Sequence, residues 1–321
     1  MRRTIVARTA DEIDDLRYFW ESLEIQPSAT MFQSFTWNHV AAKVFAEREG
    51  PIVVYSVDDS GAALIPTAVD LSRSRLTLLG ETVFDYRDVL CVGDQQALSS
   101  AWSRLSEAGM KFAVAGIRSK PSLSSWSQFN LSPFYGAPCI SPATVSASDF
   151  ASEHGRLARW KRRLERDGAS LKCHTGGNSE LVRLIYERKG NQPAEIGENL
   201  FCDRLRQQFM VEVCRNVGST CEIFTFEAAG TLIAALVTFR DRNTRRFYTV
   251  YFDERWAKYS PGTVLIYEVT CRSLENGLEC DYMTGEHLYK MRFATSVVPM
   301  YWAEASPKAL AGGLAHEKMA S

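Results

Sequence analysis

The stretch of residues 246–295 constrains the fold of this chain more than any other. Its aromatic and β-branched run at residues 247–252 predicts a strand, residues 261–276 predict a helix, and residues 278–284 predict a further strand. A polar and aromatic segment completes the stretch. Strand, short turn, helix and strand in this order predict an α/β unit.

The start of the predicted helix carries little side-chain bulk. Proline suits the first helical position, as at Pro261, because the amide there has no partner within the helix. Gly262 and Thr263 follow, so the first turn presents bare backbone amides, and such a helix start can bind a phosphate group. Taken alone, the turn favours a diphosphate site and an ordinary helix start equally, because Ser-Pro-Gly opens many helices that bind nothing.

The same stretch carries a family resemblance. The turn, the strand that holds Asp281, the glycine Gly285 and the segment from Tyr289 to Arg292 resemble the GNAT acyltransferase superfamily, specifically its CelD-like branch, first associated with cellulose and exopolysaccharide biosynthesis. The resemblance implies that acetyl-CoA places its pyrophosphate on the turn and its pantetheine between two splayed strands. It assigns cofactor binding to Lys258, Tyr259, Ser260, Pro261, Gly262, Thr263 and Val264.

Candidate catalytic residues follow the predicted helix. Where the family pattern places an acidic or other polar residue beside Glu286, this chain has His287, so the identity of the general base stays open. Tyr289 or Lys290 could protonate the leaving thiolate or stabilise the oxyanion. Asp281 is a further candidate, and it could equally be a structural acid that accepts hydrogen bonds from loop amides.

Length and composition limit the class of protein. The 321 residues exceed a single typical core, so two domains or a duplicated one are expected, and no apolar run approaches a membrane span. The formal net charge of −1 provides no global field that would attract nucleic acid. The eight cysteines form no C-x-x-C pair, so we expect buried reduced thiols, none of them a nucleophile, in a cytoplasmic protein without a metal.

The order of the predicted elements indicates one α/β unit that is duplicated along the chain. In the first half, helices at residues 11–24 and 36–49 precede a three-stranded meander at residues 51–80, and a loop, a helix and a strand follow. After a serine- and proline-rich linker at residues 124–149, the second half repeats this order. We predict an α/β (α+β) fold of tandem GNAT-like domains, each a mixed, mostly antiparallel sheet flanked by helices: a degenerate domain at residues 1–140, an acyl-CoA-binding domain at residues 141–308 and a flexible tail at residues 309–321.

The two halves differ at the start of the corresponding helix. In the first half Asp94 is an expected N-cap, whose carboxylate would fill the amides and repel a diphosphate. In the second half the turn at Ser260 carries no acid, and Lys258 stands close by. We therefore expect CoA in the second half, with the first half shaping the acceptor cleft.

Three further features carry an acceptor or phosphate hypothesis. Asp85 and Tyr86 lie in a loop that is either solvated or in contact with substrate, and the resemblance favours substrate because the CelD-like branch tends to carry a similar pair. Lys189 and Gln192 match a Lys-x-x-Gln stretch that relatives place near the acceptor. The basic run at residues 156–166 could bind the 3′-phosphate of CoA or an anionic acceptor, but a solvated helix face explains it better.

These features predict an acyl-CoA-dependent acyltransferase, an acetyl-CoA N- or O-acetyltransferase that transfers directly without an acyl-enzyme. The acceptor is expected to be a small molecule or a saccharide linked to polysaccharide or cell-envelope biosynthesis, with no nucleic acid and no metal involved. Two alternatives stay open: a Fem-type aminoacyl transferase acting on a cell-wall precursor, and a catalytically degenerate binding protein. The oligomeric state, the acyl chain length and the chemistry of the acceptor are not determined by the sequence.

Overall fold

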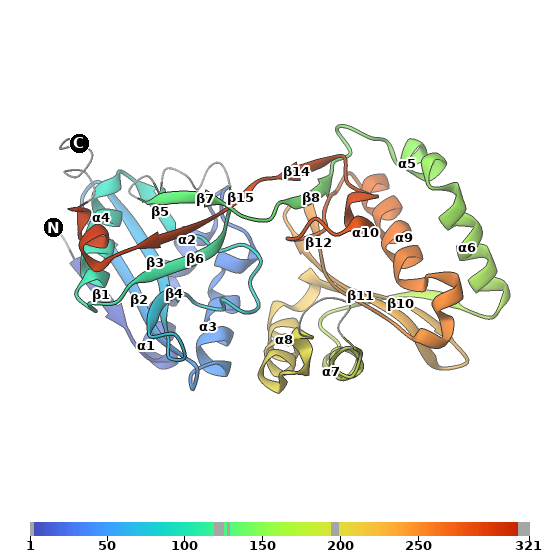
Figure 1. Ribbon diagram of the computed structural model, residues 1–321, viewed down its shortest axis with the longest axis horizontal. Coiled ribbons are helices and arrows are strands. Elements are labelled where there is room, and N and C mark those ends of the chain that lie inside the picture. Colours follow the sequence, from blue (N-terminus) through green and yellow to red (C-terminus); the bar gives the residue numbers. More distant parts are fainter. Residues whose placement is uncertain (1–2, 119–124, 127–128, 194–198, 314–321) are drawn as a thin grey trace. The chain divides into compact units, whose positions relative to one another are not determined.

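The computed structural model describes residues 3–118, 125–126, 129–193 and 199–313, which form two compact units (Figure 1). The first unit comprises Met1–Tyr135 and Pro299–Ser321, and the second comprises Gly136–Val298. The units therefore divide a few residues before the expected boundary at 140, and residues 299–308, which we expected in the second domain, belong to the first unit.

In the first unit, strands come before, between and after the helices in chain order. Its elements, in chain order, are β1 (Arg3–Ala7), α1 (Ala10–Asp14), α2 (Arg17–Glu24), η1 (Met31–Gln33), α3 (Phe35–Val44), β2 (Glu49–Val57), β3 (Gly61–Asp70), β4 (Arg75–Leu78), β5 (Leu90–Gly93), α4 (Gln95–Ser106), β6 (Phe112–Arg118), β7 (Asn130–Pro133), β15 (Met300–Ala305) and the short turn η6 (Ala309–Gly313). The expected tail at residues 309–321 thus begins with this turn, and its residues 314–321 lie outside the described residues.

The second unit repeats the pattern with longer helices. Its elements are β8 (Ala137–Ile140), α5 (Ala147–Glu153), α6 (Gly155–Arg166), β9 (Ser170–Thr175), α7 (Ser179–Gly190), η3 (Leu200–Cys202), α8 (Arg204–Val217), η4 (Gly218–Thr220), β10 (Cys221–Ala228), β11 (Thr231–Asp241), β12 (Thr244–Phe252), η5 (Glu254–Tyr259), α9 (Pro261–Glu275), β13 (Glu279–Asp281), α10 (Leu288–Met291) and β14 (Ser296–Val298).

Both sheets have the same order of strands. The first runs β1-β2-β3-β4-β6-β15-β7, with β5 beside β3, and the second, read from its other end, runs β9-β10-β11-β12-β13-β8-β14. Every pair is antiparallel except β4 with β6 and β12 with β13, which occupy the same place in the two sheets. A mixed, mostly antiparallel sheet in each unit is what the sequence predicted.

The sixth strand of the first sheet, β15, comes from the end of the chain, after the whole second unit, whereas the sixth strand of the second sheet, β8, is the first strand of that unit. Strand β8, which follows β7 closely in sequence, pairs with β13 and β14 of the second unit, and β15 pairs with β6 and β7 of the first. The serine- and proline-rich stretch at residues 124–149 was expected to be a linker, but it contains β7 and β8. These strands escaped prediction because each has only four residues and contains a proline, Pro133 or Pro138, which interrupts the β pattern.

Two of the predicted helices are shorter or divided. The first, expected at residues 11–24, is divided into α1 and α2 at Asp15 and Leu16. Thr9 caps the start of α1 by accepting a hydrogen bond from the Glu12 amide, and α2 begins without a side-chain cap. The second, expected at residues 36–49, ends at Val44, where the chain turns toward β2.

In the first unit, both faces of the sheet are covered by helices. Ile52 and Val54 of β2 pack in the core beneath α4, whereas Val53 and Tyr55 pack beneath α1, α2 and α3. This alternation follows from the two-residue period of a strand, and it explains why β2 reads as a continuous apolar run. In the second unit the large core lies between the sheet and α9, with α5 and α6 packed on α9.

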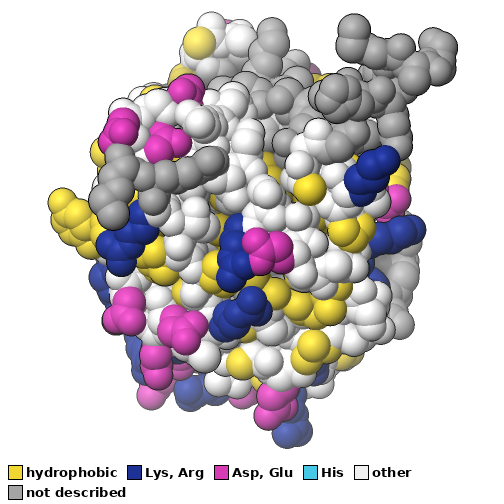
Figure 2. All heavy atoms as spheres, turned by 90° about the vertical axis from the view of Figure 1, so that its left-hand side faces the viewer, with side chains coloured by type: hydrophobic (Ala, Val, Ile, Leu, Met, Phe, Trp, Pro, Cys, Tyr) yellow, Lys and Arg dark blue, Asp and Glu magenta, His cyan; other side chains and the backbone are white. Residues whose placement is uncertain are grey.

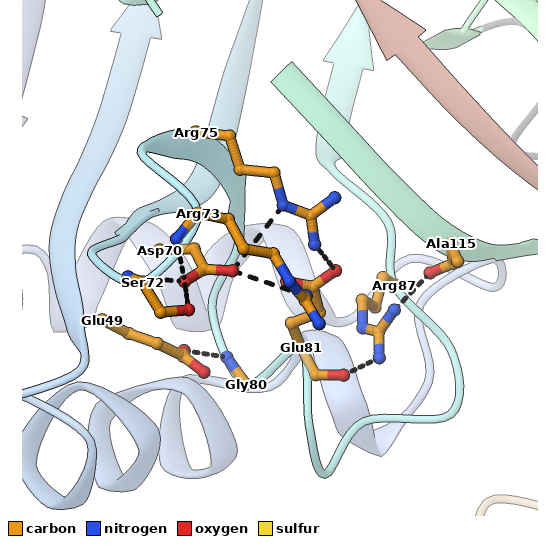
Figure 3. Close-up of polar contacts among 9 residues, drawn as sticks. All are labelled: Glu49, Asp70, Ser72, Arg73, Arg75, Gly80, Glu81, Arg87 and Ala115. Carbon is orange, nitrogen blue, oxygen red and sulfur yellow. Dashed lines mark hydrogen bonds and ion pairs between the residues drawn. The ribbon is translucent and has the colours of Figure 1, made fainter. Parts of the chain in front are cut away.

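Charged side chains in the first unit form a connected network near the end of β3 (Figure 3). Arg73 and Arg75 contact Asp70, and Arg75 also pairs with Glu81 at 2.5 Å. Glu49, 6% exposed, accepts a hydrogen bond from the amide of Gly80 at 3.0 Å. Burial raises the pKa of the Glu49 carboxyl to about 7.

On the side of the first unit that Figure 2 shows, the described residues do not form a binding face of a single charge. Figure 2 shows one side of this unit, where acidic and basic side chains are mixed among polar ones and hydrophobic side chains lie between them. On the described part of that side, neither sign of charge forms a continuous patch. The mixture agrees with the formal net charge of −1 of the whole chain.

Candidate active site

Strands β12 and β13 separate after a short parallel pairing. Their register runs from Thr244 opposite Glu279 to Arg246 opposite Asp281. Beyond this point β12 continues to Phe252, whereas β13 has ended. One edge of β12 therefore lies beside an opening in the sheet, as the expected pair of splayed strands requires.

The turn before α9 leaves the helix start without a side-chain cap. Ser260 has a left-handed conformation, with φ of 48°, and its hydroxyl makes no capping hydrogen bond. Pro261 occupies the first turn, and that turn contains no acidic side chain. Backbone amides at an uncapped helix start, together with the helix dipole, favour an anionic ligand.

Gly262 allows this helix start to lie against β12. A Cβ atom built on Gly262 would come within 3.2 Å of a methyl group of Val250 and 3.4 Å of the ring of Phe252. A larger side chain would push the turn away from the strand. The glycine therefore has a packing reason as well as the one that the phosphate hypothesis gave it.

A pocket of about 760 Å³ joins the turn to the segment after β13. It includes seven of the residues expected to bind cofactor or acceptor or to act in catalysis: Ser260, Gly262, Thr263, His287, Tyr289, Lys189 and Gln192. The other lining residues are mostly apolar or come from η3 and η5: Pro193, Asn199, Leu200, Phe201, Val250, Phe252, Glu254, Ala257 and Ile266. Seven residues from three separate parts of the sequence thus line one pocket.

His287 and Tyr289 form the polar end of this pocket. Their rings lie nearly parallel, with centroids 5.9 Å apart and an angle of 17° between the planes. His287 is exposed and immediately precedes α10, and Tyr289 is half-buried within it. An imidazole and a phenol side by side can accept and donate a proton at neighbouring positions.

The other catalytic candidates hold the loop that carries this pair. Asp281, 6% exposed, forms a buried ion pair with Arg246 and accepts the Met283 amide at 2.8 Å. The ammonium group of Lys290 donates to the carbonyl oxygens of Met283 and Thr284. Through these contacts Asp281 and Lys290 hold the loop in place. For Asp281, a structural role of this kind is one of the two that the sequence left open.

Glu286 also contributes to the shape of the loop. Its carboxylate accepts a hydrogen bond from the amide of Gly136 at 3.0 Å, which joins the loop to the segment before β8. Glu286 does not line the pocket of about 760 Å³, whereas His287 does. Of the two candidate bases, His287 is therefore the one placed beside the pocket.

The wall opposite His287 is built by the end of α7 and by η3. The side-chain amide of Gln192 donates to the carbonyl of Phe252 at 2.7 Å, which ties this wall to the end of β12. Asn199 donates to the carbonyls of Lys189 and Gln192, at 2.8 and 2.7 Å. Asn199 and Phe201 were missed by sequence reasoning, because a single asparagine before a short apolar run resembles any helix cap.

The remaining cofactor candidates flank the turn. The hydroxyl of Tyr259 donates to the carboxylate of Asp167, which anchors the turn to the end of α6. The ammonium of Lys258 lies 4.7 Å from the centre of the Tyr259 ring, and contact with Tyr259 raises the Lys258 pKa. Pro261 and Val264 are buried and support the helix from beneath.

Asp85 and Tyr86 belong to the first unit and do not line this pocket. Tyr86 is 1% exposed, and its ring packs edge-on against Phe32 in the core. Its backbone carbonyl accepts a hydrogen bond from the side-chain amide of Gln33. The loop that we expected to face substrate therefore places its phenol inside the first unit, where the ring packs against Phe32 of η1.

Cys280, the cysteine nearest the candidate site in sequence, is a poor nucleophile. Burial raises the pKa of the Cys280 thiol to about 12, so its thiolate is scarce at neutral pH. Among the described residues, no group of three or more metal-ligating side chains comes together. Over the same residues, no helix has the length and apolar character needed to cross a membrane.

Comparison with known proteins agrees with this geometry. Residues 151–291 match a family profile described as Acetyltransferase (GNAT) domain. That match contains the turn, α9 and the segment with His287 and Tyr289. No curated protein sequence matches the chain.

Three solved structures have a similar fold over nearly their whole length. L-PGS from Bacillus licheniformis has a TM-score of 0.58 at 10% identity, with 94% of each chain covered. FemX has a TM-score of 0.54 at 9% identity, with 93% of this chain and 96% of FemX covered. A tandem GNAT protein from the clavulanic acid biosynthesis pathway has a TM-score of 0.52 at 10% identity, with 96% and 99% covered. The predicted fold class, two mixed sheets in tandem with flanking helices, is confirmed.

Proposed function

We propose that this protein transfers an acyl group from acyl-CoA to an amine or hydroxyl acceptor. The proposal starts from its tandem GNAT fold, whose second unit carries an acetyltransferase domain of the CelD-like family. One observation carries the proposal. The uncapped start of α9 and the His287–Tyr289 pair line the same pocket, so a phosphate-binding turn and proton-transfer groups are adjacent.

The residues present fit CoA as a co-substrate. The amides of the first turn of α9 would hold the diphosphate, and the lack of a side-chain cap leaves them available. Thr263 lines the pocket at this turn, and Lys258 lies just before it. Val250, Phe252 and Ile266 provide the apolar wall along which a pantetheine arm would run.

The catalytic tasks fall to His287 and Tyr289. Bound acyl-CoA supplies an activated acyl group: a bond forms between its carbonyl carbon and the acceptor nitrogen or oxygen, and the carbon–sulfur bond breaks. His287 accepts the proton that the acceptor loses, and Tyr289 donates a proton to the departing thiolate. Asp281, Glu286 and Lys290 act as positioning residues, because their side chains bind the loop that carries the pair.

The acceptor is proposed to enter beside α7 and η3. Lys189 and Gln192 bring a cation and an amide to this wall, which suits an acceptor rich in oxygen, such as a saccharide. Asn199 holds the wall in place through its hydrogen bonds to the carbonyls of both residues. The CelD-like branch supports a substrate from polysaccharide or cell-envelope biosynthesis. Catalysis would depend mainly on holding donor and acceptor side by side.

Two measurements test the proposal. Calorimetric titration should show that acetyl-CoA binds, and release of free thiol should identify an amine or hydroxyl acceptor from a screen. On that acceptor, Tyr289→Phe and His287→Ala should each lower turnover by roughly 10²-fold or more with little change in acetyl-CoA affinity. His287→Ala should also remove one limb of the pH–rate profile.

Leu288→Ala provides the matched control. Leu288 lies between the two proposed catalytic residues, is 89% exposed and does not line the pocket, so its loss should leave turnover unchanged. A protein that folds but does not bind acetyl-CoA would refute the function. Normal turnover in both Tyr289→Phe and His287→Ala would instead refute the roles given to these residues.

A further inference from the structure

We propose that Phe247, together with Leu236 and Tyr282, limits the donor to a short acyl group by closing the inner end of the donor site. This inference rests on the proposed function and concerns a part of the site that the sequence did not indicate. Family membership does not determine the length of the acyl group that this protein can accept.

A second, smaller cavity adjoins the main pocket. It holds about 50 Å³ and shares Val250, Ile266 and Tyr289 with the pocket of about 760 Å³. The remaining lining residues close it from the inside: Leu236, Phe247, Tyr248, Tyr282 and Lys290. Because three lining residues are common to both cavities, the small cavity lies directly beside the large one, on the side of β11 and Tyr282.

The small cavity lies where the thioester end of the donor is expected. Arg246 is the last residue of β12 paired with β13, and Phe247 comes next, so the cavity sits at the apex of the opening between the strands. From Phe252, beside the α9 start, to Phe247 the strand spans about 17 Å. A pantetheine arm that starts at the turn and follows β12 therefore points its acyl end at this apex.

A bulge in β12 brings Phe247 to the same face as the rest of the donor wall. Val237 is opposite Thr249 and Thr238 is opposite Phe247, so Tyr248 is an extra residue in the strand. In a regular strand, residues three apart point to opposite faces. The extra residue reverses the alternation, and Phe247 and Val250 both pack in the core on the α9 side.

The inner wall is held in place by its neighbours. Phe247 and Tyr282 are 6% and 2% exposed, and their rings pack with centroids 5.1 Å apart. The Tyr282 hydroxyl lies 3.1 Å from the hydroxyl of Thr270 on α9, which fixes the ring from behind. Leu236, on β11, is 1% exposed. Since buried side chains interdigitate closely, the wall cannot yield without loss of packing.

The size of the cavity limits what it can hold. A single water needs roughly 10–15 Å³ of such space, so the cavity has room for only a few groups of that size. An acetyl or propionyl group fits this space, whereas an octanoyl chain would have to displace Phe247 or leave the cavity.

A chain-length series tests the inference. Calorimetry with CoA, acetyl-CoA, butyryl-CoA and octanoyl-CoA should show that affinity falls by roughly tenfold or more between the acetyl and octanoyl donors. Phe247→Leu and, independently, Leu236→Ala should enlarge the inner end and restore binding of the longer donors relative to acetyl-CoA. Two variants are used because either substitution alone could impair folding, which thermal unfolding would reveal.

Phe226→Leu is the matched control. Phe226 is fully buried in the same core but does not line the cavity, so its substitution should cost similar stability and leave the chain-length preference unchanged. Equal affinity for all acyl-CoAs in the parent would overturn the inference while leaving the proposed function intact. Failure of every donor, CoA included, to bind the folded protein would overturn the proposed function itself.

Discussion

The starts of α4 and α9 occupy corresponding places in the two units, yet they satisfy their backbone amides differently. At α4 the carboxylate of Asp94 accepts the Gln96 amide at 2.8 Å. At α9 Ser260 makes no such bond, and its left-handed backbone turns the chain directly into Pro261. At α4 the Asp94 side chain occupies a backbone amide of the first turn, whereas at α9 no capping side chain stands between the amides and a ligand.

Under the proposed function, the two units share an architecture, but only the second has an open helix start for the donor. The strand order and the single parallel pair are the same in both sheets, so the packing of strands does not require an open helix start. One carboxylate at the helix N-terminus stabilises α4 and at the same time excludes a second anion. The site therefore depends on a few residues that the fold itself can spare.

The largest expected effect comes from placing a charge at the open start. Thr263→Asp should weaken acetyl-CoA binding by about a thousandfold through like-charge repulsion, while the helix dipole keeps the fold stable. The control, Gln96→Asp, adds the same charge to the first turn of α4 and should leave binding unchanged. Gly262→Asp is less suitable, because its Cβ would crowd Val250. Equal loss of binding in Thr263→Asp and Gln96→Asp would erase the distinction between the two helix starts.

The second prediction compares a buried acid of each unit. In the second unit Arg246 neutralises Asp281, whereas in the first unit burial raises the pKa of Glu49 from 4.5 to about 7 despite a hydrogen bond from Gly80. A folded-state pKa above the unfolded value favours the protonated acid on folding. The contribution of Glu49 to stability is thus fully present below pH 4.5 and is lost as pH rises through about 7.

Glu49→Gln should therefore raise stability at pH 8 by at most roughly 3 kcal/mol and change it little at pH 4.5. The amide oxygen of glutamine can still accept the Gly80 amide. Chemical denaturation at the two pH values measures both differences. An equal change at pH 4.5 and pH 8 would show that the ionisation of Glu49 is not the cause.

The smallest expected effect concerns the caps themselves. Asp94→Ala should lower stability by about 1 kcal/mol because it removes a capping hydrogen bond, whereas Ser260→Ala should change stability much less because Ser260 has no such bond to lose. Thermal unfolding of both variants, with acetyl-CoA absent, measures this. A larger loss in Ser260→Ala than in Asp94→Ala would mean that the start of α9 is capped in solution after all.

Much of this architecture was predictable because it depends on local patterns. The meanders, the long helices and the turn at Pro261 follow from residue periodicity and from proline and glycine chemistry, and three of the four predicted site segments line one pocket. Strands β7, β8 and β15 were not predicted, since their pairing partners lie far away in the sequence. The inner cavity depends on the extra residue at Tyr248, and a one-residue register shift leaves no trace in composition.

The position of β15 at the end of the chain also has a consequence for how the protein is made. The first sheet cannot receive its sixth strand until Met300–Ala305 has been synthesised, after the whole second unit. At roughly 5–20 residues per second, the ribosome takes many seconds to cover that interval, during which β6 and β7 of the first unit lack the strand that lies between them. Unpaired edges of this kind are where chaperones bind and where nascent chains aggregate, so the last strand to leave the ribosome completes the first domain to begin folding.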